Sequence, residues 1–320
     1  MSASESKRAV LAALGANLGI ALTKFIAWIF SGSASMLAEG VHSVADSANQ
    51  MLLLLGRRQA RRHADIEHPF GYGRERYIYA FVVSIVLFSV GGVFSIYEGI
   101  EKLAHTHELS VPWLPIVVLV IAIVLESLSL RTAVREAEKQ RGDQGWIAFI
   151  RHSKNPELPV VLLEDAAALA GLVFAFLGVG LTIITGNGVF DGLGTLMIGT
   201  LLIAVALVLG IETKSLLVGE GASARDVAAI REAILADDQV EALIHMRTLY
   251  LGPDELLVAA KVAFSGRKRL SDVAGAIDAL ESRIRSALPI ARLIYIEPDV
   301  YSPPSETNPP TDAVIIRSAD

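Results

Sequence analysis

The chain has 320 residues, of which 52% are hydrophobic and 19% are charged, with a mean hydropathy of +0.50 and a formal net charge of −6. Soluble proteins carry about 25% charged residues, and the apolar residues here form long uncharged runs between positions 8 and 212. This distribution excludes a soluble one-domain enzyme, a disordered chain and a disulfide scaffold. Cysteine is absent, which excludes a thiolate nucleophile and a cysteine zinc site. The modest charge gives nucleic-acid binding no support.

Six runs are long enough for a helix that crosses a bilayer, which needs about 20 apolar residues. They cover residues 10–29, 34–55, 77–96, 111–130, 158–184 and 190–211. The first run lacks the cleavage pattern of a signal peptide, and barrel strands alternate over only about 10 residues. The connections 57–76 and 131–154 carry six Lys and Arg each, against one on the opposite side. This asymmetry predicts that both termini are cytoplasmic, in a multi-pass protein of the inner cell membrane.

The tail has the composition of an ordinary soluble domain. The sequence predicts a transmembrane domain over 1–212, a cytoplasmic domain over 213–301 and a tail over 302–320 without fixed structure. Ser223 is the expected N-cap of the first tail helix. The expected helices and strands, in the order α-β-β-α-β of a small two-layer α+β fold, are 224–235, 240–251, 256–264, 270–288 and 291–296.

The second apolar run contains polar residues that are costly inside a membrane. Glu39, His42, Asp46 and Asn49 interrupt it, and one charged side chain near the centre of a membrane helix costs about 2.5–3.5 kcal/mol. His42 and Asp46 are four residues apart, so they lie on one helical face. An imidazole and a carboxylate at this spacing can bind one divalent ion. A hydrogen-bonded pair that packs against another helix is the structural alternative.

The fifth run contains two adjacent carboxylates, Glu164 and Asp165. Neighbouring helix residues point about 100° apart, so one is expected to bind the ion and the other to support it or to carry a proton. We expect Asp165 to contribute more to metal affinity than Glu164. Glu126 is expected to pair with Arg131 at the cytoplasmic edge, or else to line the ion path. Asn17 in the first run is expected to make a packing hydrogen bond. Asp191 is expected to be a carboxylate at the N-terminus of the sixth helix.

These residues resemble the cation diffusion facilitator family over nearly the whole chain. The run SMLAEGVHSVAD at 35–46 is similar to the signature of the second family helix, and HPFGYGR at 68–74 to its loop motif. The segment ETKSLL at 212–217 leads into a tail that resembles the cytoplasmic domain of the family. The Leu-Glu-Asp of the fifth run, 163–165, is similar to the branch that contains the mitochondrial zinc transporter.

The resemblance implies a six-helix membrane domain, a ferredoxin-like cytoplasmic domain and a homodimer. It implies export of a divalent metal ion, usually zinc, in exchange for protons, with no cofactor beyond that transported ion. The central family site takes two ligands from the second helix and two from the fifth. His42 and Asp46 match the first pair. The fifth helix departs from the usual His-x-x-x-Asp, because Val161 precedes Asp165 at that spacing and Ala168 follows Glu164.

Two other family sites are incomplete in this chain. Tyr72 stands where the loop motif often has His, which leaves Asp65, Glu67 and His68 as candidate weak ligands, or as a solvated group of charges. In the tail, His245 stands where some family members have a metal ligand. Tyr295 and Glu297 occupy positions that hold His and Asp in other members. We expect the tail to serve dimerisation more than metal sensing.

Other classes of membrane protein fit the pattern less well. A metal-gated channel would have a polar stripe along a helix, and a metal sensor would have a ligand-rich soluble domain. A metal-dependent membrane enzyme would need an open coordination position and a base. The polar residues cluster at one depth of the apolar runs, so the sequence favours a carrier that is not an enzyme.

Overall fold

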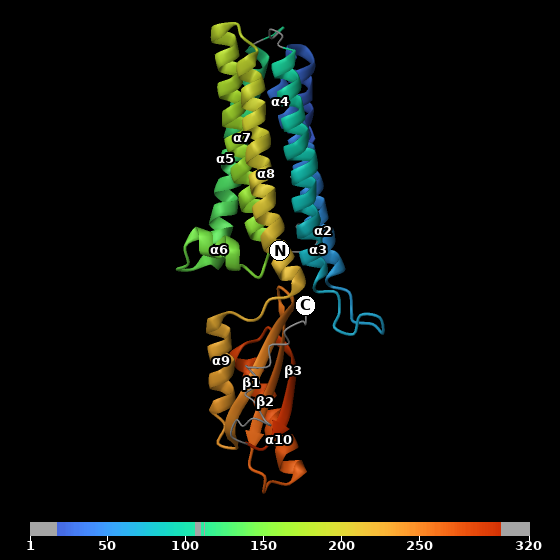
Figure 1. Ribbon diagram of the computed structural model, residues 1–320, viewed down its shortest axis with the longest axis vertical. Coiled ribbons are helices and arrows are strands. Elements are labelled where there is room, and N and C mark those ends of the chain that lie inside the picture. Colours follow the sequence, from blue (N-terminus) through green and yellow to red (C-terminus); the bar gives the residue numbers. More distant parts are fainter. Residues whose placement is uncertain (1–17, 106–109, 112, 302–320) are drawn as a thin grey trace, which may run out of the picture. The chain divides into compact units, whose positions relative to one another are not determined.

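The computed structural model describes residues 18–105, 110–111 and 113–301 (Figure 1). The chain divides into two compact units. The first contains residues up to Gln59 together with Glu75–Lys214, and the second contains Ala60–Arg74 and the chain from Ser215 onward. The predictions for Asn17 and for the tail from residue 302 lie outside the described residues.

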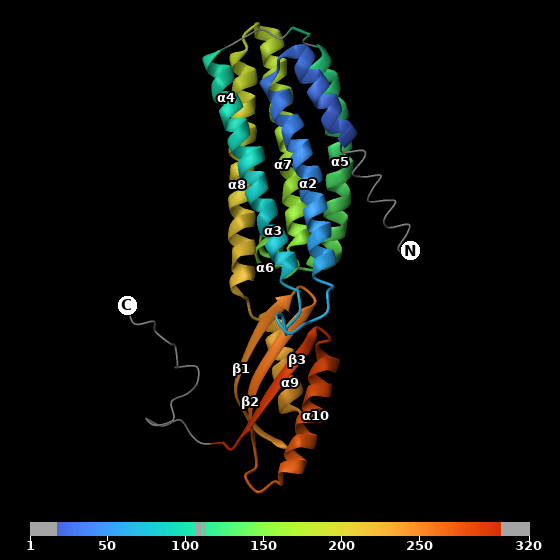
Figure 2. The same ribbon diagram turned by 90° about the vertical axis from the view of Figure 1, so that its right-hand side faces the viewer.

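The first unit consists of helices that run side by side in both views (Figures 1 and 2). It begins, in the described part, with the helix Leu18–Ser31. The helices that follow are α2 (Ala34–Gln59), α3 (Glu75–Val86), the π-helix η1 (Leu87–Val93), α4 (Phe94–Ala104), α5 (Trp113–Arg141), α6 (Trp146–His152), α7 (Glu157–Thr185) and α8 (Val189–Val218).

Four helices of the described chain are long and apolar enough to cross a membrane: Glu75–Ala104, α5, α7 and α8. They correspond to the third to sixth predicted runs. The helix Leu18–Ser31 is shorter within the described residues. The 26-residue α2 is about 39 Å long, but its polar residues reduce its apolar character. The structure therefore has a multi-pass membrane unit. The first predicted span, 10–29, lies partly outside the described residues, and α2 is not among the helices that meet both requirements.

Local helix geometry differs from the prediction at three places. The helix predicted over 111–130 extends to Arg141, and the short α6 follows it where a loop was expected. The third run widens into the π-helix η1. At Gly92 in η1, a Cβ atom would lie 2.6 Å from Cγ1 of Ile203. The absence of a side chain there allows close packing against α8, an effect that periodicity alone does not indicate.

Asp191 joins the beginnings of α2 and α8. It lies in the first turn of α8, as expected, and it is completely buried. Its carboxylate accepts hydrogen bonds from the Ser33 hydroxyl at 2.9 Å and from the backbone N–H of Ala34 at 2.7 Å and of Ser35 at 3.2 Å. A helix N-terminus has unsatisfied N–H donors and a positive dipole end. Asp191 therefore caps α2, the helix that carries the candidate metal ligands.

The second unit has the predicted α-β-β-α-β order. Its elements are α9 (Ala224–Leu235), β1 (Val240–Gly252), β2 (Glu255–Phe264), α10 (Leu270–Ala287) and β3 (Ala291–Asp299). The strand order is β1-β2-β3, with β1 and β2 antiparallel and β2 and β3 parallel. Ser223 is the N-cap of α9 and accepts a hydrogen bond from the Asp226 N–H, as predicted.

The core of the second unit lies between its helices and one face of its sheet. Alternate residues of β2 from Leu256 to Phe264 are buried, together with Ile230 of α9 and Leu280 of α10. The loop 60–74 also belongs to this unit. A Cβ atom at Gly73 would lie 2.6 Å from the carbonyl oxygen of Leu251 at the end of β1. Glycine in the loop motif thus permits direct backbone packing.

Candidate metal centre

The predicted imidazole–carboxylate pair is present on α2. His42 is 1% exposed, and its Nδ1 atom lies 3.4 Å from Oδ1 of Asp46, one helical turn further along. Neither ring nitrogen of His42 has a hydrogen-bond partner within the described residues. A buried polar atom without a partner is costly. Both nitrogens of this ring are therefore available to a ligand.

Glu164 brings α7 to the same face of α2. Its carboxylate accepts a 2.8 Å hydrogen bond from the Asn49 side-chain amide. The carboxyl groups of Asp46 and Glu164 also lie close enough to interact with each other. Two neighbouring carboxyl groups can bind a cation together once both are deprotonated.

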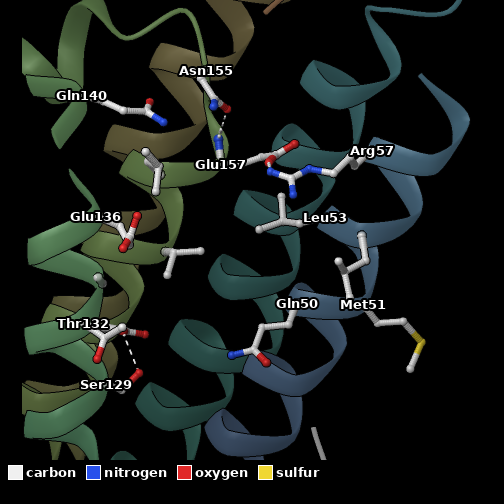
Figure 3. Close-up of a pocket in the computed structure, with 15 residues that line it drawn as sticks. Gln50, Met51, Leu53, Arg57, Ser129, Thr132, Glu136, Gln140, Asn155 and Glu157 are labelled. Atoms are coloured by element: carbon white, nitrogen blue, oxygen red, sulfur yellow. Dashed lines mark hydrogen bonds and ion pairs between the residues drawn. The ribbon is translucent and has the colours of Figure 1, made fainter. Parts of the chain in front are cut away.

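Asp165, the neighbour of Glu164, points in a different direction. Its carboxylate accepts a 2.9 Å hydrogen bond from the Ser129 hydroxyl of α5. It also lines a pocket of about 730 Å³ between α2, α5 and α7 (Figure 3). The polar residues of the pocket lining are Gln50, Arg57, Ser129, Thr132, Glu136, Gln140, Asn155, Glu157 and Asp165. The turn of about 100° between adjacent helix residues separates the two acids.

Three of the four predicted ligands therefore lie together, and the fourth lies apart. Asp46 contacts both His42 and Glu164, whereas Asp165 faces α5. Across the described residues, no three His, Cys, Asp or Glu side chains are close enough together to hold a metal ion. A bound ion would therefore require the ligands on α2 and α7 to come closer together. The other intramembrane acid, Glu126, forms no ion pair with Arg131 in the described structure, contrary to the expectation.

Sequence analysis missed Lys24, which lies within the first helix. Its ammonium donates to Oε2 of Glu39 and to the hydroxyl of Ser43, each at 2.8 Å. Lys24 is 4% exposed and Glu39 is 0% exposed. The available signal was a lysine inside one apolar run and, fifteen residues later, a glutamate inside the next apolar run. Counting positive charges only in the connections overlooked it.

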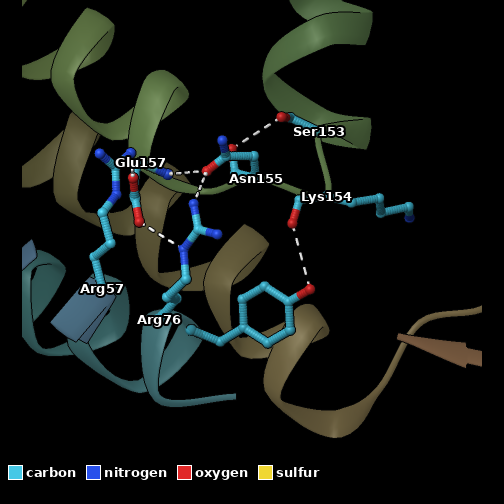
Figure 4. Close-up of polar contacts among 7 residues, drawn as sticks. Arg57, Arg76, Ser153, Lys154, Asn155 and Glu157 are labelled. Carbon is cyan, nitrogen blue, oxygen red and sulfur yellow. Dashed lines mark hydrogen bonds and ion pairs between the residues drawn. The ribbon is translucent and has the colours of Figure 1, made fainter. Parts of the chain in front are cut away.

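A second group that sequence analysis missed lies at the arginine-rich end of the bundle (Figure 4). The carboxylate of Glu157, at the start of α7, accepts from Arg57 at 2.5 Å and from Arg76 at 2.6 Å. Arg76 also donates to the Asn155 side chain at 3.2 Å, and Tyr77 donates to the Lys154 carbonyl at 3.3 Å. This Glu157 cluster joins α2, α3 and α7 beside the pocket. Sequence analysis counted its arginines only as topology signals.

The loop residues make hydrogen bonds with one another. The Asp65 carboxylate accepts from the Tyr72 hydroxyl at 2.6 Å and from the His68 N–H at 2.7 Å. Arg62 stacks over the Tyr72 ring, 4.2 Å from its centroid. The Tyr72 hydrogen bond, together with those from His68, lowers the pKa of Asp65. Glu67 takes no part in these hydrogen bonds. Tyr72 and His68 therefore occupy the Asp65 carboxylate that a metal ion would need.

Replacing Tyr72 with Phe is expected to raise the pKa of Asp65 toward its ordinary value, because the hydrogen bond that favours the charged carboxylate is lost. The stabilisation that this bond gives is present above the ordinary pKa and is lost as the pH falls through the lowered one. Carboxyl-carbon NMR titration of aspartate-labelled protein measures the shift. An unchanged Asp65 titration in Tyr72→Phe would contradict the contact.

The tail positions also fail to form a ligand set. Nδ1 of His245 is buried without a hydrogen-bond partner among the described residues. Glu297 pairs with Lys261 at 3.0 Å, and the Tyr295 side chain is exposed. His245, Tyr295 and Glu297 all line a pocket of about 380 Å³.

Comparisons with known proteins identify the family of the helical unit. The family model described as "Cation efflux transmembrane domain" matches residues 10–218. The human mitochondrial proton-coupled zinc antiporter SLC30A9 is 34% identical over 246 residues, which are 76% of this chain and 43% of the human protein. The Xenopus laevis protein of the same name is 36% identical over 76% of this chain. The chain spans less than half the length of these relatives.

Two more distant relatives cover more of their own length. Metal tolerance protein C4 of Arabidopsis thaliana is 31% identical over 82% of this chain and 58% of its own. The cation-efflux pump FieF of Pectobacterium atrosepticum is 25% identical over 92% of this chain and 93% of its own. The family match covers the whole helical unit, including both helices of the linked His42–Asp46–Glu164 group. The chain therefore belongs to the cation efflux, or cation diffusion facilitator, family, near the branch of the mitochondrial zinc transporter.

Proposed function

We propose that this protein exports a divalent metal cation, zinc in the first place, in exchange for protons. The observation that carries the proposal is the buried His42–Asp46–Glu164 group between two helices of an apolar bundle. Charged groups at such a place are costly and mark ion pathways. The names of the similar proteins, zinc antiporter and cation-efflux pump, support the same activity.

His42, Asp46 and Glu164 are the proposed ligands, and Asp165 is a group of the entrance pocket. One imidazole with two carboxylates suits Zn²⁺, and also Co²⁺, Fe²⁺ or Mn²⁺. Ligands bind a metal only when deprotonated, so binding releases protons. The neighbouring carboxyl groups of Asp46 and Glu164 are the proposed carriers of the exchanged protons. A site of this kind, reached alternately from each side of the membrane, makes the protein a carrier with no enzymatic step.

The proposal includes the arrangement that the family resemblance implies. The helix Leu18–Ser31 and α2 complete a six-helix membrane domain, and the second unit is a cytoplasmic ferredoxin-like domain that mediates a homodimer. The arginine-rich end of the bundle then faces the cytoplasm, with both termini. The inner cell membrane is the proposed location. A protein that senses zinc, or is gated by it, without pumping is the competing function.

Transport by the full chain in proteoliposomes tests this function. The vesicles contain a zinc dye and a pH dye. Added Zn²⁺ is expected to enter while protons leave, and a vesicle interior that is more acidic than the outside is expected to accelerate zinc entry. Repeating the assay with Mn²⁺, Fe²⁺, Co²⁺ and Mg²⁺ ranks the ions. A sensor would bind zinc without flux, and a channel would pass zinc without moving protons. Either result would overturn the antiport proposal.

A further inference from the structure

Glu39 is a carboxylate whose two oxygens have different surroundings. Oε2 accepts from the Lys24 ammonium at 2.8 Å, whereas Oε1 has no hydrogen-bond partner among the described residues. The residue is 0% exposed. A purely structural ion pair in so apolar a place is expected to satisfy both oxygens, because an unsatisfied buried charge is expensive.

The free oxygen of Glu39 faces α7 at a position that has no side chain. A Cβ atom at Gly171 would lie 2.9 Å from Oε1. On the other side, Lys24 reaches Glu39 from the first helix, which packs closely against α2 at Gly40. There a Cβ atom would lie 3.2 Å from the Phe25 ring. Gly171 thus leaves room for the carboxylate without supplying a second donor, and Gly40 allows the first helix to approach α2.

Glu39 continues the line of the proposed metal ligands. Residues 39, 42, 46 and 49 follow the three-and-four spacing of one helical face. Each of the four has a buried polar atom without a hydrogen-bond partner within the described part of the chain: Glu39 Oε1, both His42 nitrogens, Asp46 Oδ1 and Asn49 Oδ1. Glu39 lies one turn from His42, on the side where α2 begins and away from Arg57.

We propose that Glu39 is a second position for the transported divalent cation, and that the Lys24 ammonium occupies it as a tethered counter-ion whenever the metal is absent. This inference rests on the proposed function. A metal ion that leaves His42 toward the beginning of α2 meets Glu39, binds Oε1 and displaces the ammonium, which keeps its contact with Ser43. When the ion departs, Lys24 returns to Glu39 and opposes the entry of another cation from that side.

Counting bound zinc tests the counter-ion directly. In the detergent-solubilised full chain, Lys24→Met is expected to bind one more Zn²⁺ per chain than the parent protein, because the ammonium no longer competes for Glu39. The Lys24→Met/Glu39→Gln double variant is expected to lose that extra ion. A structural ion pair predicts no gain in either variant. An unchanged zinc count in folded Lys24→Met would overturn the proposal. The count is taken by equilibrium dialysis.

A glycine pair decides the question if Lys24→Met does not fold. Gly171→Ala places a methyl group against Oε1 of Glu39, whereas Gly180→Ala on the same helix meets nothing within 4 Å. Gly171→Ala is expected to slow zinc flux about tenfold with zinc affinity unchanged, and Gly180→Ala to leave both unchanged. Equal flux in the two variants would overturn the proposal. The proposed function is tested separately by His42→Ala. If that variant keeps the zinc flux of the parent protein, the proposed function fails whatever the result for Glu39.

Discussion

Replacing Glu164 with Gln is expected to reduce zinc flux by about 100-fold or more, whereas Asp165→Asn at the next residue is expected to cost about tenfold or less. The first substitution removes a carboxylate that contacts Asp46 beside His42. The second alters a group that is held by Ser129 at the pocket. Even outer partners of metal ligands contribute about 10–100-fold to affinity or activity, so a direct ligand is expected to exceed that.

The two substitutions are matched, because each removes one negative charge with almost no change in volume at adjacent positions. Zinc flux into proteoliposomes and zinc affinity by calorimetry are both measured, with His42→Ala as the reference for a lost site. Protein recovered in the same oligomeric state by size exclusion controls for folding. A larger loss of affinity in Asp165→Asn would assign the α7 ligand to Asp165, as sequence analysis expected.

Much of the fold could be predicted from the sequence, because strong local signals set it. Long apolar runs mark α5, α7 and α8, and the Ser223 cap and the alternation of β2 identify the second unit. Charged and polar side chains are costly inside a membrane helix. His42 and Asp46 of α2 could therefore be selected as candidate ligands before any contact was known. These signals lie within single elements.

What the sequence could not provide depends on contacts between elements. The direction of Glu164 and Asp165 depends on the rotation of α7 against α2 and α5, which a helical spacing does not fix. The Lys24–Glu39 pair needs the first helix to pack on α2. The close packing of η1 on α8 at Gly92 is likewise a contact between separate helices. Each of these is a tertiary effect that local propensity does not encode.

Replacing Glu157 with Gln is expected to destabilise the helical unit by about 3 kcal/mol, the magnitude found when one partner of a buried ion pair is removed. The Glu157 and Arg76 side chains are only 11% and 9% exposed, so water cannot replace the lost carboxylate well. Arg57 is 52% exposed, and Arg57→Gln is therefore expected to cost about 1 kcal/mol or less.

Thermal unfolding of the full chain in one detergent, followed by size exclusion, compares these variants with Glu136→Gln. Glu136 also lines the pocket and also pairs with a cation, Lys139, but both side chains are more than half exposed. Its loss is expected to leave the melting temperature unchanged, because solvent already screens that pair. If Glu136→Gln and Glu157→Gln lowered the melting temperature equally, burial would not be the cause. A selective loss in Glu157→Gln would identify the Glu157 cluster as the junction that holds α2, α3 and α7 together.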